Sequence, residues 1–537
     1  MAVVEHPRIR PGVLDDRLYQ ERIAATAIDH NTLVVLPTGL GKTAIALRVI
    51  AEWLLRAPTR SILFLAPTRP LVLQHARTVA ASLFTPPPVV LTGTIPPDRR
   101  AALLAPPQIV VATPQVVGND LARAEFRLED YSLIIFDEAH RAAGDYPYVT
   151  IGEANRRGAH ARVLAMTASP GPRLERIREV WYHLGIERFE YRTAQDTDVM
   201  PYVHGVGVET VEVPIPAEVK HLGILLRTTV ARQEDLLRKM HRLPEQPVGR
   251  RELLGLGAQL RLEISNARRE GQNGGAALWS AVTAQSVAMK GLHALELIET
   301  QGVDALRGFL AKQSESPGGR MKPAQRAFLG DPDVAQAIVA LSSIQIEHPK
   351  VAKAVEIVTK ELRSSPDSRV IIFTQYRQTA DVLVAELRRA ADPAVRAERF
   401  VGQASHGTDE GLTQKEQLAI LDQFRAGSVN CLIATSVAEE GLDIPSTNLV
   451  LFYEPVPDLI RTIQRRGRTG RARLGRAIVL VAGGTRDVGL ARSAAGKEVR
   501  MHQMLERVEE EAARGTLPPP PPSKTVQRSL FEYNAPS

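Results

Sequence analysis

The segment TLVVLPTGLGKTAIALRVI at residues 32–50 carries the strongest indication of the fold of this chain. Residues 32–36 form a short, mainly apolar run rich in β-formers, which predicts a buried strand. After the loop, Ala46, Val49 and Ile50 recur at helical spacing, which predicts a helix. Between them, Gly39 and Gly41 leave the backbone free to approach a phosphate group. A strand, a glycine-rich loop and a helix in this order predict a phosphate-binding loop.

The residues of this loop predict the cofactors ATP and Mg²⁺. Backbone amides at the start of the helix are expected to hold the phosphates. Lys42 is expected to reach the β- and γ-phosphates, and the Thr43 hydroxyl is expected to bind Mg²⁺. The other expected contributors to the phosphate cradle are Thr38, Gly39 and Gly41. A glycine-rich turn is often only a tight connection, so this interpretation depends on further segments.

Two further segments supply the expected chemistry. The apolar run at 133–136 delivers Asp137 and Glu138 to the carboxyl end of a strand, where open α/β sheets bind ligands. Asp137 is expected to hold Mg²⁺ through water, and Glu138 to orient and deprotonate the attacking water. The segment QRRGRTGR at 464–471 lies too far along the chain for the same sheet. On a second domain, Arg468 and Arg471 would act as arginine fingers across a cleft.

Apolar runs alternate with helical stretches in two separate parts of the chain. In the first part, up to about residue 205, the runs lie at 61–65, 109–112, 133–136 and 163–166. In the second part, from about residue 347, they lie at 370–373, 429–433, 449–452 and 477–481. Such alternation is typical of a parallel sheet covered by helices. The predicted fold class is therefore α/β, with two RecA-like parallel-sheet domains and a helical insert domain between them.

The predicted domain boundaries follow from these patterns. The expected parts are a first domain at 1–205, the insert at 206–346, a second domain at 347–497, a C-terminal helix at 498–517 and a proline-rich linker at 518–526. The insert reads as several helices broken at glycine- and proline-rich segments. It carries paired basic residues, Arg250 with Arg251 and Arg268 with Arg269. On charge patterning alone, these basic pairs fit a solvated helix face and a nucleic-acid-binding surface equally well.

Composition narrows the class of partner and compartment. Sixty-seven basic and 60 acidic residues give a net charge of +7, which modestly favours a polyanionic partner. Cys431 is the only cysteine, which excludes an internal disulfide and a cysteine-based zinc site. The N-terminal residues lack a signal-peptide core, and no apolar stretch approaches membrane-spanning length. We expect a cytoplasmic protein that does not bind membranes.

The full set of motifs resembles the helicase part of the Hef/FANCM family within superfamily 2. Besides the segments above, the motifs are RLYQ at 17–20, APTRPLVLQH at 66–75, MTASPG at 166–171, FTQYRQTA at 373–380, FVGQASHGTDEGLTQKEQ at 400–417 and IATSVAEEGLDIP at 433–445. The resemblance covers residues from about 12 to 500. It implies an ATP-dependent DNA helicase or translocase that acts on forked or branched DNA in replication-fork repair and recombination.

The resemblance also assigns roles to individual residues. Gln20 would read the adenine, Asp443 would contact the nucleotide across the cleft, and Gln464 would position the attacking water. The residues expected to couple phosphate state to domain closure are His140, Thr167 and Ser169. The expected strand-tracking residues are Thr68, Arg69 and Thr113 in the first domain and Gln375 and Thr435 in the second. The insert resembles the thumb-like domain of Hef, which favours branched-DNA binding by Arg250, Arg251, Arg268 and Arg269.

The segment VQRSLFEYNAPS at 526–537 predicts a partner. Gln527, Leu530 and Tyr533 have the spacing of a motif at 527–534 that binds the sliding clamp PCNA, although Asn534 replaces the usual second aromatic residue. The nuclease signature of full-length Hef does not occur in this sequence, so a nuclease would be a separate partner.

Two alternative functions remain open at this point. One is a double-stranded RNA-stimulated ATPase, because RIG-I-like helicases share this organisation with a helical insert. The other is an ATP-gated DNA-binding adaptor that recruits the clamp or a nuclease. The intact Glu138, Arg468 and Arg471 argue against a catalytically dead adaptor.

Overall fold

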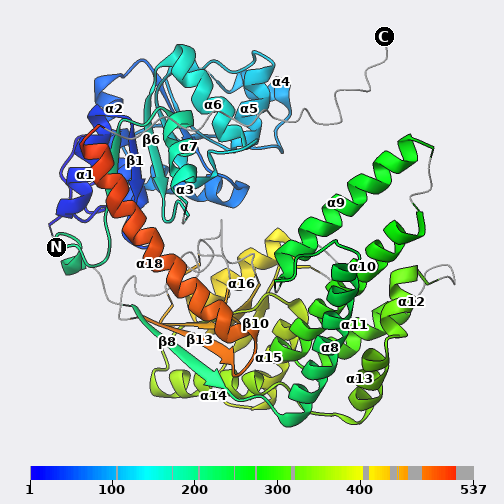
Figure 1. Cartoon of the computed structure of the whole chain (residues 1–537). Helices are drawn as coiled ribbons and strands as arrows, with labels where there is room; N and C mark the ends of the chain where they lie inside the picture. Colours follow the sequence, from blue (N-terminus) through cyan, green and yellow to red (C-terminus); the bar gives the residue numbers. More distant parts are fainter. Residues whose placement is uncertain are drawn as a thin grey trace.

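The computed structural model describes most of the chain. It covers residues 2–515 apart from 105–106, 172, 203–205, 247, 272–274, 316–320, 403–410, 436–443, 446 and 457–474. Two parallel sheets and a helical domain make up the described part (Figure 1). The predicted α/β class, with two RecA-like domains and a helical insert, is confirmed. No helix in these described ranges is long and apolar enough to cross a membrane.

The first domain is built around a parallel sheet with the strand order β3-β4-β2-β5-β6-β1-β7. Its strands are β1 (Thr32–Val35), β2 (Ser61–Leu65), β3 (Val89–Leu91), β4 (Ile109–Ala112), β5 (Tyr131–Asp137), β6 (Arg162–Thr167) and β7 (Arg188–Tyr191). Its helices are α1 (Leu18–Asp29), α2 (Lys42–Arg56), α3 (Arg69–Ser82), α4 (Pro97–Ala102), α5 (Pro114–Ala122), α6 (Pro147–Ala154) and α7 (Leu174–Leu184). All residues of β5 are buried, because helices cover both faces of the sheet.

The second sheet has the strand order β10-β11-β9-β12-β13-β8. Its strands are β8 (Val206–Val213), β9 (Val370–Phe373), β10 (Ala397–Phe400), β11 (Cys431–Ala434), β12 (Leu449–Phe452) and β13 (Gly475–Ala482). The helices that pack on it are α14 (Pro349–Ser364), α15 (Arg377–Arg389) and α16 (Gln414–Ala426).

Strand β8 lies outside the insert to which the sequence assigned it. It pairs with β13 from Val206 opposite Gly475 to Val213 opposite Ala482, and so forms an edge of the second sheet. The helical part of the insert therefore begins at Ala217 rather than at residue 206. The pairing joins two segments separated by the whole insert, which local patterns of hydrophobicity do not reveal.

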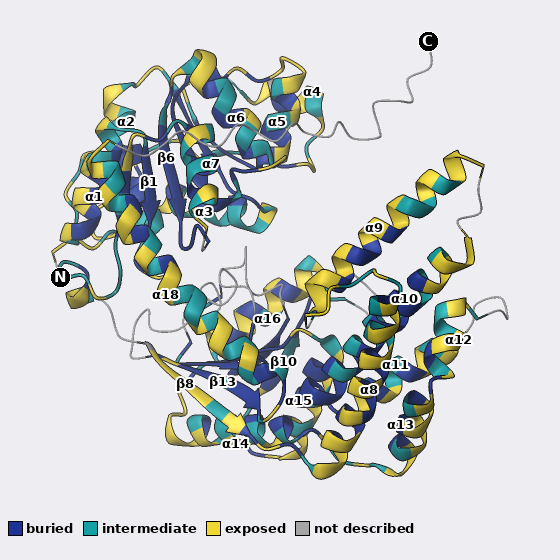
Figure 2. Ribbon diagram, viewed as in Figure 1, coloured by how far each residue is buried: buried dark blue, intermediate teal, exposed yellow. Residues whose placement is uncertain are grey.

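The helical insert, called the thumb below, comprises residues 217–343. Its helices are α8 (Ala217–Lys239), α9 (Arg250–Arg269), α10 (Gly275–Thr300), α11 (Val303–Ser314), α12 (Pro323–Leu329) and α13 (Pro332–Ser343). A Cβ atom on Gly291 would lie 2.7 Å from Val230 Cγ2, so the glycine lets α10 pack closely against α8. Helix α9 projects from the rest of the thumb, and much of its surface is exposed (Figures 1 and 2).

Helix α18 (Arg486–Ala513) connects the two sheet domains. It begins just after β13 and runs to the first domain, where Met501, Leu505 and Val508 join the hydrophobic core (Figure 1). The sequence predicted a boundary at residues 497 and 498, but one continuous helix crosses that position. The predicted C-terminal helix at 498–517 is thus the second half of a helix that already begins at Arg486.

Candidate nucleotide and nucleic-acid sites

The loop between β1 and α2 has the backbone that phosphate binding requires. Gly39 and Gly41 have φ angles of 92° and 82°, in the left-handed region that favours glycine. A Cβ atom on Gly41 would lie 2.4 Å from Gln20 Nε2, so a larger residue cannot stand there without displacing that side chain. Thr38 and Thr43 flank these glycines and are half-buried. The strand, loop and helix therefore occur in the predicted order.

Helix α1 fixes the position of the loop through side-chain hydrogen bonds. Gln20 is 2% exposed, and its Nε2 donates to the Leu40 carbonyl at 3.0 Å. The Tyr19 hydroxyl donates to the same carbonyl at 2.7 Å. Lys42 Nζ donates to the Leu36 carbonyl at 2.8 Å, which keeps the ammonium group over the loop. Gln20 and Lys42 thus meet at one loop, as expected for residues that share a nucleotide.

Asp137 ends β5 with a carboxylate that is ionised and almost fully buried. Burial opposes ionisation, but a hydrogen bond from His75 and the charge of Lys42 hold the pKa of Asp137 below its usual value. His75 Nε2 lies 2.9 Å from Asp137 Oδ2. Magnesium sites on nucleotides usually combine one or two carboxylates with phosphate oxygens. Asp137, with Thr43 at the start of α2, fits that donor set.

Glu138 has an unusual backbone and an unusual side chain. Its φ angle of 51° lies in the left-handed region, which is uncommon for residues other than glycine and is often found at functional sites. Its Oε2 atom is buried and accepts no hydrogen bond from any described residue. His140 Nδ1 lies 3.3 Å from that oxygen. A buried carboxylate oxygen in this position suits a group that binds and deprotonates water.

The residues expected to couple phosphate state to closure form a connected chain. His140 Nδ1 lies 3.0 Å from Thr167 Oγ1, and the Ser169 amide donates to the same hydroxyl oxygen at 3.2 Å. The Ser169 hydroxyl contacts Met501 Sδ at 3.1 Å. Because Met501 belongs to α18, this chain reaches from the site to the helix that joins the domains. No pattern in the sequence indicates this role for Met501.

The strand-tracking candidates of the first domain lie at neighbouring strand ends. Thr68 follows β2 and precedes α3, and Thr113 follows β4 and precedes α5. The register of the sheet pairs Leu65 with Ala112, so both threonines lie at the same edge. Arg69, the first residue of α3, is exposed. Helix N-termini favour phosphate groups, because free amides and the helix dipole point toward them.

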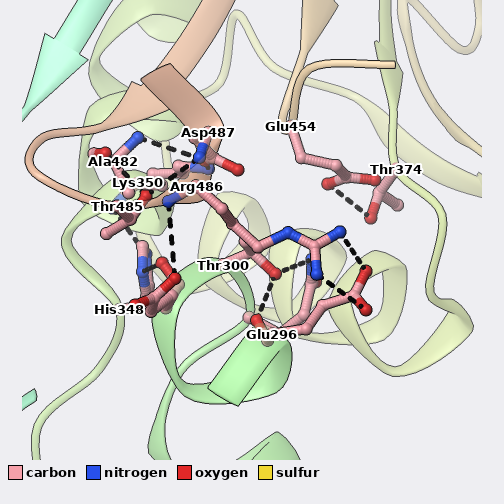
Figure 3. A network of polar contacts seen from close by, with 12 residues as sticks. Glu296, Thr300, His348, Lys350, Thr374, Glu454, Ala482, Thr485, Arg486 and Asp487 are labelled. Atoms are coloured by element: carbon pink, nitrogen blue, oxygen red, sulfur yellow. Dashed lines mark hydrogen bonds and ion pairs between the residues drawn. The ribbon is translucent and has the colours of Figure 1, made fainter. Parts of the chain in front are cut away.

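The second domain repeats this arrangement. Gln375 follows β9 and Thr435 follows β11, and the register pairs Phe373 with Ala434. The Gln375 backbone amide and the Thr374 hydroxyl both donate to the carboxylate of Glu454, which fixes the backbone at this edge. Figure 3 shows the contact between Thr374 and Glu454. Each sheet therefore presents a pair of candidates from two adjacent strands.

The four predicted arginines of the thumb have different surroundings. Arg250 donates to Glu296 Oε2 at 2.7 Å, and Arg486 of α18 binds the same carboxylate. Arg250 thus joins α9 to α10 within the thumb, and Arg486 joins the same carboxylate to the start of α18. Arg251, Arg268 and Arg269 are exposed. A hollow near the end of α9 is lined by Arg261, Ile264, Ser265, Arg268 and Arg269.

Several predicted site residues lie outside the described residues. They are Asp443, Gln464, Arg468, Arg471, Gln527, Leu530 and Tyr533.

Comparisons with known families agree with the two-domain organisation. Residues 17–177 match the DEAD/DEAH box helicase family, and residues 353–473 match the helicase conserved C-terminal domain. Residues 218–348 match a family described as a putative ATP-dependent RNA helicase, helical bundle.

The solved helicase domain of Pyrococcus furiosus Hef is 42% identical in sequence, with a TM-score of 0.69. The similarity covers 90% of this chain and 99% of that one, thumb included. The chain belongs to the Hef/FANCM family. Members of this family carry the two domains of ATP-dependent helicases, which are hydrolases.

Curated relatives of this Hef-family chain are longer than it is. A putative ATP-dependent RNA helicase of Methanocaldococcus jannaschii is 38% identical over 94% of this chain and 62% of its own length. The DEAD-box ATP-dependent DNA helicase Fancm of Drosophila melanogaster is 32% identical over 98% of this chain and 36% of its own length. The chain thus spans between about a third and two thirds of these relatives.

Proposed function

We propose that this chain is an ATP-driven DNA helicase or translocase that remodels forked or branched DNA. The observation that carries the proposal is the repeated pair of candidates at adjacent strand ends. Thr68 and Thr113 occupy these positions in the first sheet, and Gln375 and Thr435 occupy them in the second. Two matching rows of polar groups suit one strand backbone that runs across both domains, because phosphate contacts hold register without reading sequence.

The nucleotide would lie at the other half of the first sheet edge. The ends of β1, β5 and β6 carry Lys42, Asp137 and Thr167, whereas β2 and β4 lead to Thr68 and Thr113. Loop amides and Lys42 bind the phosphates, and Glu138 takes a proton from the attacking water. Bound Mg²⁺ neutralises charge on the phosphates. Closure of the two domains on ATP, and reopening after hydrolysis, would advance the strand.

The thumb supplies a surface suited to a duplex arm. The exposed face of α9 carries Arg251, Leu254, Leu262 and Arg269 at helical spacing. Arg261 and Arg268 border this face, which contains no acidic residue. The acidic residues of α9 lie on the opposite side: Glu252 accepts from the Gly249 amide and Glu263 from Arg242. A basic, acid-free face about 27 Å long matches the phosphate backbone of a duplex.

A triple substitution tests this role of the thumb. Arg251→Ala with Arg268→Ala and Arg269→Ala should weaken fork binding more than single-strand binding. It should also lower the slope of log affinity against log salt for the fork by up to about three. Arg250 is left intact because it pairs with Glu296.

The matched control is Lys312→Ala with Arg326→Ala, which removes exposed cations elsewhere on the thumb. If the triple variant loses equal affinity for forked and single-stranded DNA, the α9 face is a general electrostatic surface without preference for a fork. A loss in the control equal to that in the triple variant would also contradict the proposal.

ATPase stimulation distinguishes the proposal from its two alternatives. Rates should be compared on single-stranded DNA, duplex DNA, forks, Holliday junctions and duplex RNA. We expect forks and junctions to stimulate most. Strong stimulation by duplex RNA alone would favour the RNA-dependent alternative, which the name of the Methanocaldococcus relative, a putative ATP-dependent RNA helicase, also suggests. ATP turnover without strand displacement or translocation would favour the adaptor.

We further propose that residues 527–534 dock on the sliding clamp PCNA. The spacing of Gln527, Leu530 and Tyr533 in the sequence supports this. A peptide covering 523–537 should bind the clamp in calorimetry, and Leu530→Ala with Tyr533→Ala should abolish binding, because buried apolar anchors carry most of such affinities. No heat with the unsubstituted peptide would refute docking. A separate nuclease partner is compatible with the same recruitment.

A further inference from the structure

His75 connects the helix α3 to the carboxylate of Asp137. The imidazole is 5% exposed, and its Nε2 lies 2.9 Å from Asp137 Oδ2. Its ring stacks on Phe64 with 4.4 Å between ring centroids and 29° between planes. Because Asp137 is ionised, its carboxylate accepts and the imidazole donates. Stacking fixes the ring plane, so the Nε2–H group remains directed at Asp137.

The same helix carries a proposed strand contact at its N-terminus, whereas His75 lies near its middle. Helix α3 begins at Arg69 directly after Thr68, and His75 follows about 9 Å further along its axis. Val72, Ala76 and Val79 of this helix are buried in the core of the first domain. A displacement at the start of α3 is therefore carried to His75, because these residues belong to one short, regular helix.

Strands β2 and β5 bring the two sites together. Helix α3 follows β2, and β2 pairs directly with β5, at the end of which Asp137 lies. Tyr148 donates to the Asp137 carbonyl at 2.7 Å and to the Leu65 carbonyl at 3.2 Å, which holds the ends of both strands in register. With its backbone held in this way, the Asp137 side chain depends on His75 for its orientation.

We propose that His75 is a positioning residue that couples strand binding at the start of α3 to the metal-binding carboxylate of Asp137. This inference rests on the proposed function, because the strand contacts at Thr68 and Arg69 belong to it. When a strand occupies the start of α3, the position of the helix fixes the geometry of the His75 hydrogen bond. That hydrogen bond orients the Asp137 carboxylate toward Mg²⁺ and the phosphates. His75 itself touches neither the strand nor the nucleotide.

Thermodynamic linkage turns the proposal into a measurable quantity. If strand and nucleotide are coupled through His75, each changes the affinity of the other by the same factor. The His140, Thr167 and Ser169 chain runs instead toward α18. Substitution of His75 therefore tests the α3 route without altering the hydrogen bonds of the α18 route.

The experiment measures this coupling factor in the full chain. Affinity for a fluorescein-labelled oligodeoxythymidylate is compared without nucleotide and with Mg²⁺ and a non-hydrolysable ATP analogue. His75→Leu and His75→Met remove the donor, whereas His75→Gln retains an N–H group at similar reach. Thr78→Ala is the matched control on α3, because the Thr78 hydroxyl donates within its own helix, to the Gln74 carbonyl at 3.0 Å.

For the unsubstituted chain we expect a coupling factor between about 5 and about 150, the usual range for linked sites. In the His75→Leu and His75→Met variants the coupling factor should fall to within about twofold of one. In the His75→Gln and Thr78→Ala variants it should stay within about threefold of the value for the unsubstituted chain. The Mg²⁺-dependent gain in affinity for fluorescent ADP should fall with the Leu and Met variants and return with Gln. A structural role for the ring would not be rescued by glutamine.

The outcomes separate the two proposals. Absence of DNA binding by the unsubstituted chain would refute the proposed function. DNA binding with a coupling factor near one would refute only the inference about His75. That inference would also be refuted if a folded donor-free variant retained the original factor, or if glutamine behaved like leucine. Melting temperatures show whether His75→Leu or His75→Met fails to fold. If one of them does, the coupling factor of the other is compared with that of His75→Gln.

Discussion

Lys350 and Asp487 form an ion pair that is closed to solvent, with Lys350 Nζ donating to Asp487 Oδ2 (Figure 3). Lys350 lies at the start of α14, where the chain returns from the thumb, and Asp487 lies at the start of α18. Asp487 Oδ2 also accepts from the Ala482 amide at the end of β13, at 3.1 Å. One carboxylate thus joins three elements where the thumb, the second sheet and α18 meet.

Lys350→Met should destabilise the second domain by about 3–5 kcal/mol, because it leaves Asp487 buried and unpaired. Lys350→Met combined with Asp487→Asn should recover a large part of that loss, since no uncompensated charge remains. Urea unfolding of the single and double variants measures the difference. A single variant as stable as the unsubstituted chain would show that water reaches the carboxylate in solution.

Acidification should destabilise the same junction through His348. Burial and the neighbouring charge of Lys350 lower its pKa from 6.5 to about 3. Between these values the unfolded chain binds a proton that the folded chain does not. Stability should therefore fall as pH decreases below about 6.5, at about 1.4 kcal/mol per pH unit for this group.

Unfolding midpoints of the chain and of His348→Asn across this pH range test the prediction. Asparagine still caps α14 but does not titrate. Because burial also lowers the pKa of His293, the difference between the two proteins is the informative quantity. Equal pH dependence in both would contradict the assignment to His348.

Glu138→Gln should trap ATP, whereas Lys42→Ala should lose it. The glutamine variant keeps the phosphate loop and removes the base, so nucleotide binding survives while turnover falls by orders of magnitude. The alanine variant removes the principal cation on the γ-phosphate. Filter binding of ATP together with phosphate release distinguishes the two. Turnover within about threefold of the original for either variant would rule out this assignment of the cleft.

Gly41→Ala should weaken nucleotide binding by at least about tenfold, because its Cβ would displace Gln20 and its φ angle is positive. Gly12→Ala is a matched control. Gly12 also has a positive φ angle, 76°, but a Cβ atom there meets no heavy atom within 4 Å. Both variants carry backbone strain, so a loss confined to Gly41→Ala identifies the contact with Gln20. Equal losses would attribute the effect to strain alone.

The sequence predicted the structural elements that a single contiguous segment specifies. The central strands at 61–65, 109–112, 370–373 and 449–452 have the bounds that the structure gives, because buried parallel strands are unbroken apolar runs. Strands at the sheet edges were missed or assigned to the insert: β3 is only partly buried, and much of β8 is exposed. Their pairing depends on segments far away in the chain.

The same distinction applies to the candidate site. Short motifs of adjacent residues predict part of the site from the sequence alone; these motifs contain Gly41, Lys42, Asp137 and Glu138. The contact between His75 and Asp137 arises only when α3 packs on the sheet and His75 stacks on Phe64 of β2. The contact between Met501 and Ser169 arises only when α18 crosses to the first domain.

Helix α18 also limits how the two sheet domains move. Its residues 488–500 contain no buried side chain, whereas Asp487 and Met501 at either side are fixed in different domains. This span is about 20 Å long and has a constant length as long as it stays helical. It therefore acts as a connecting rod: the domains can turn about its ends, but their separation at these anchors stays constant. Gly489 and Gly496 make the rod easiest to bend within this span.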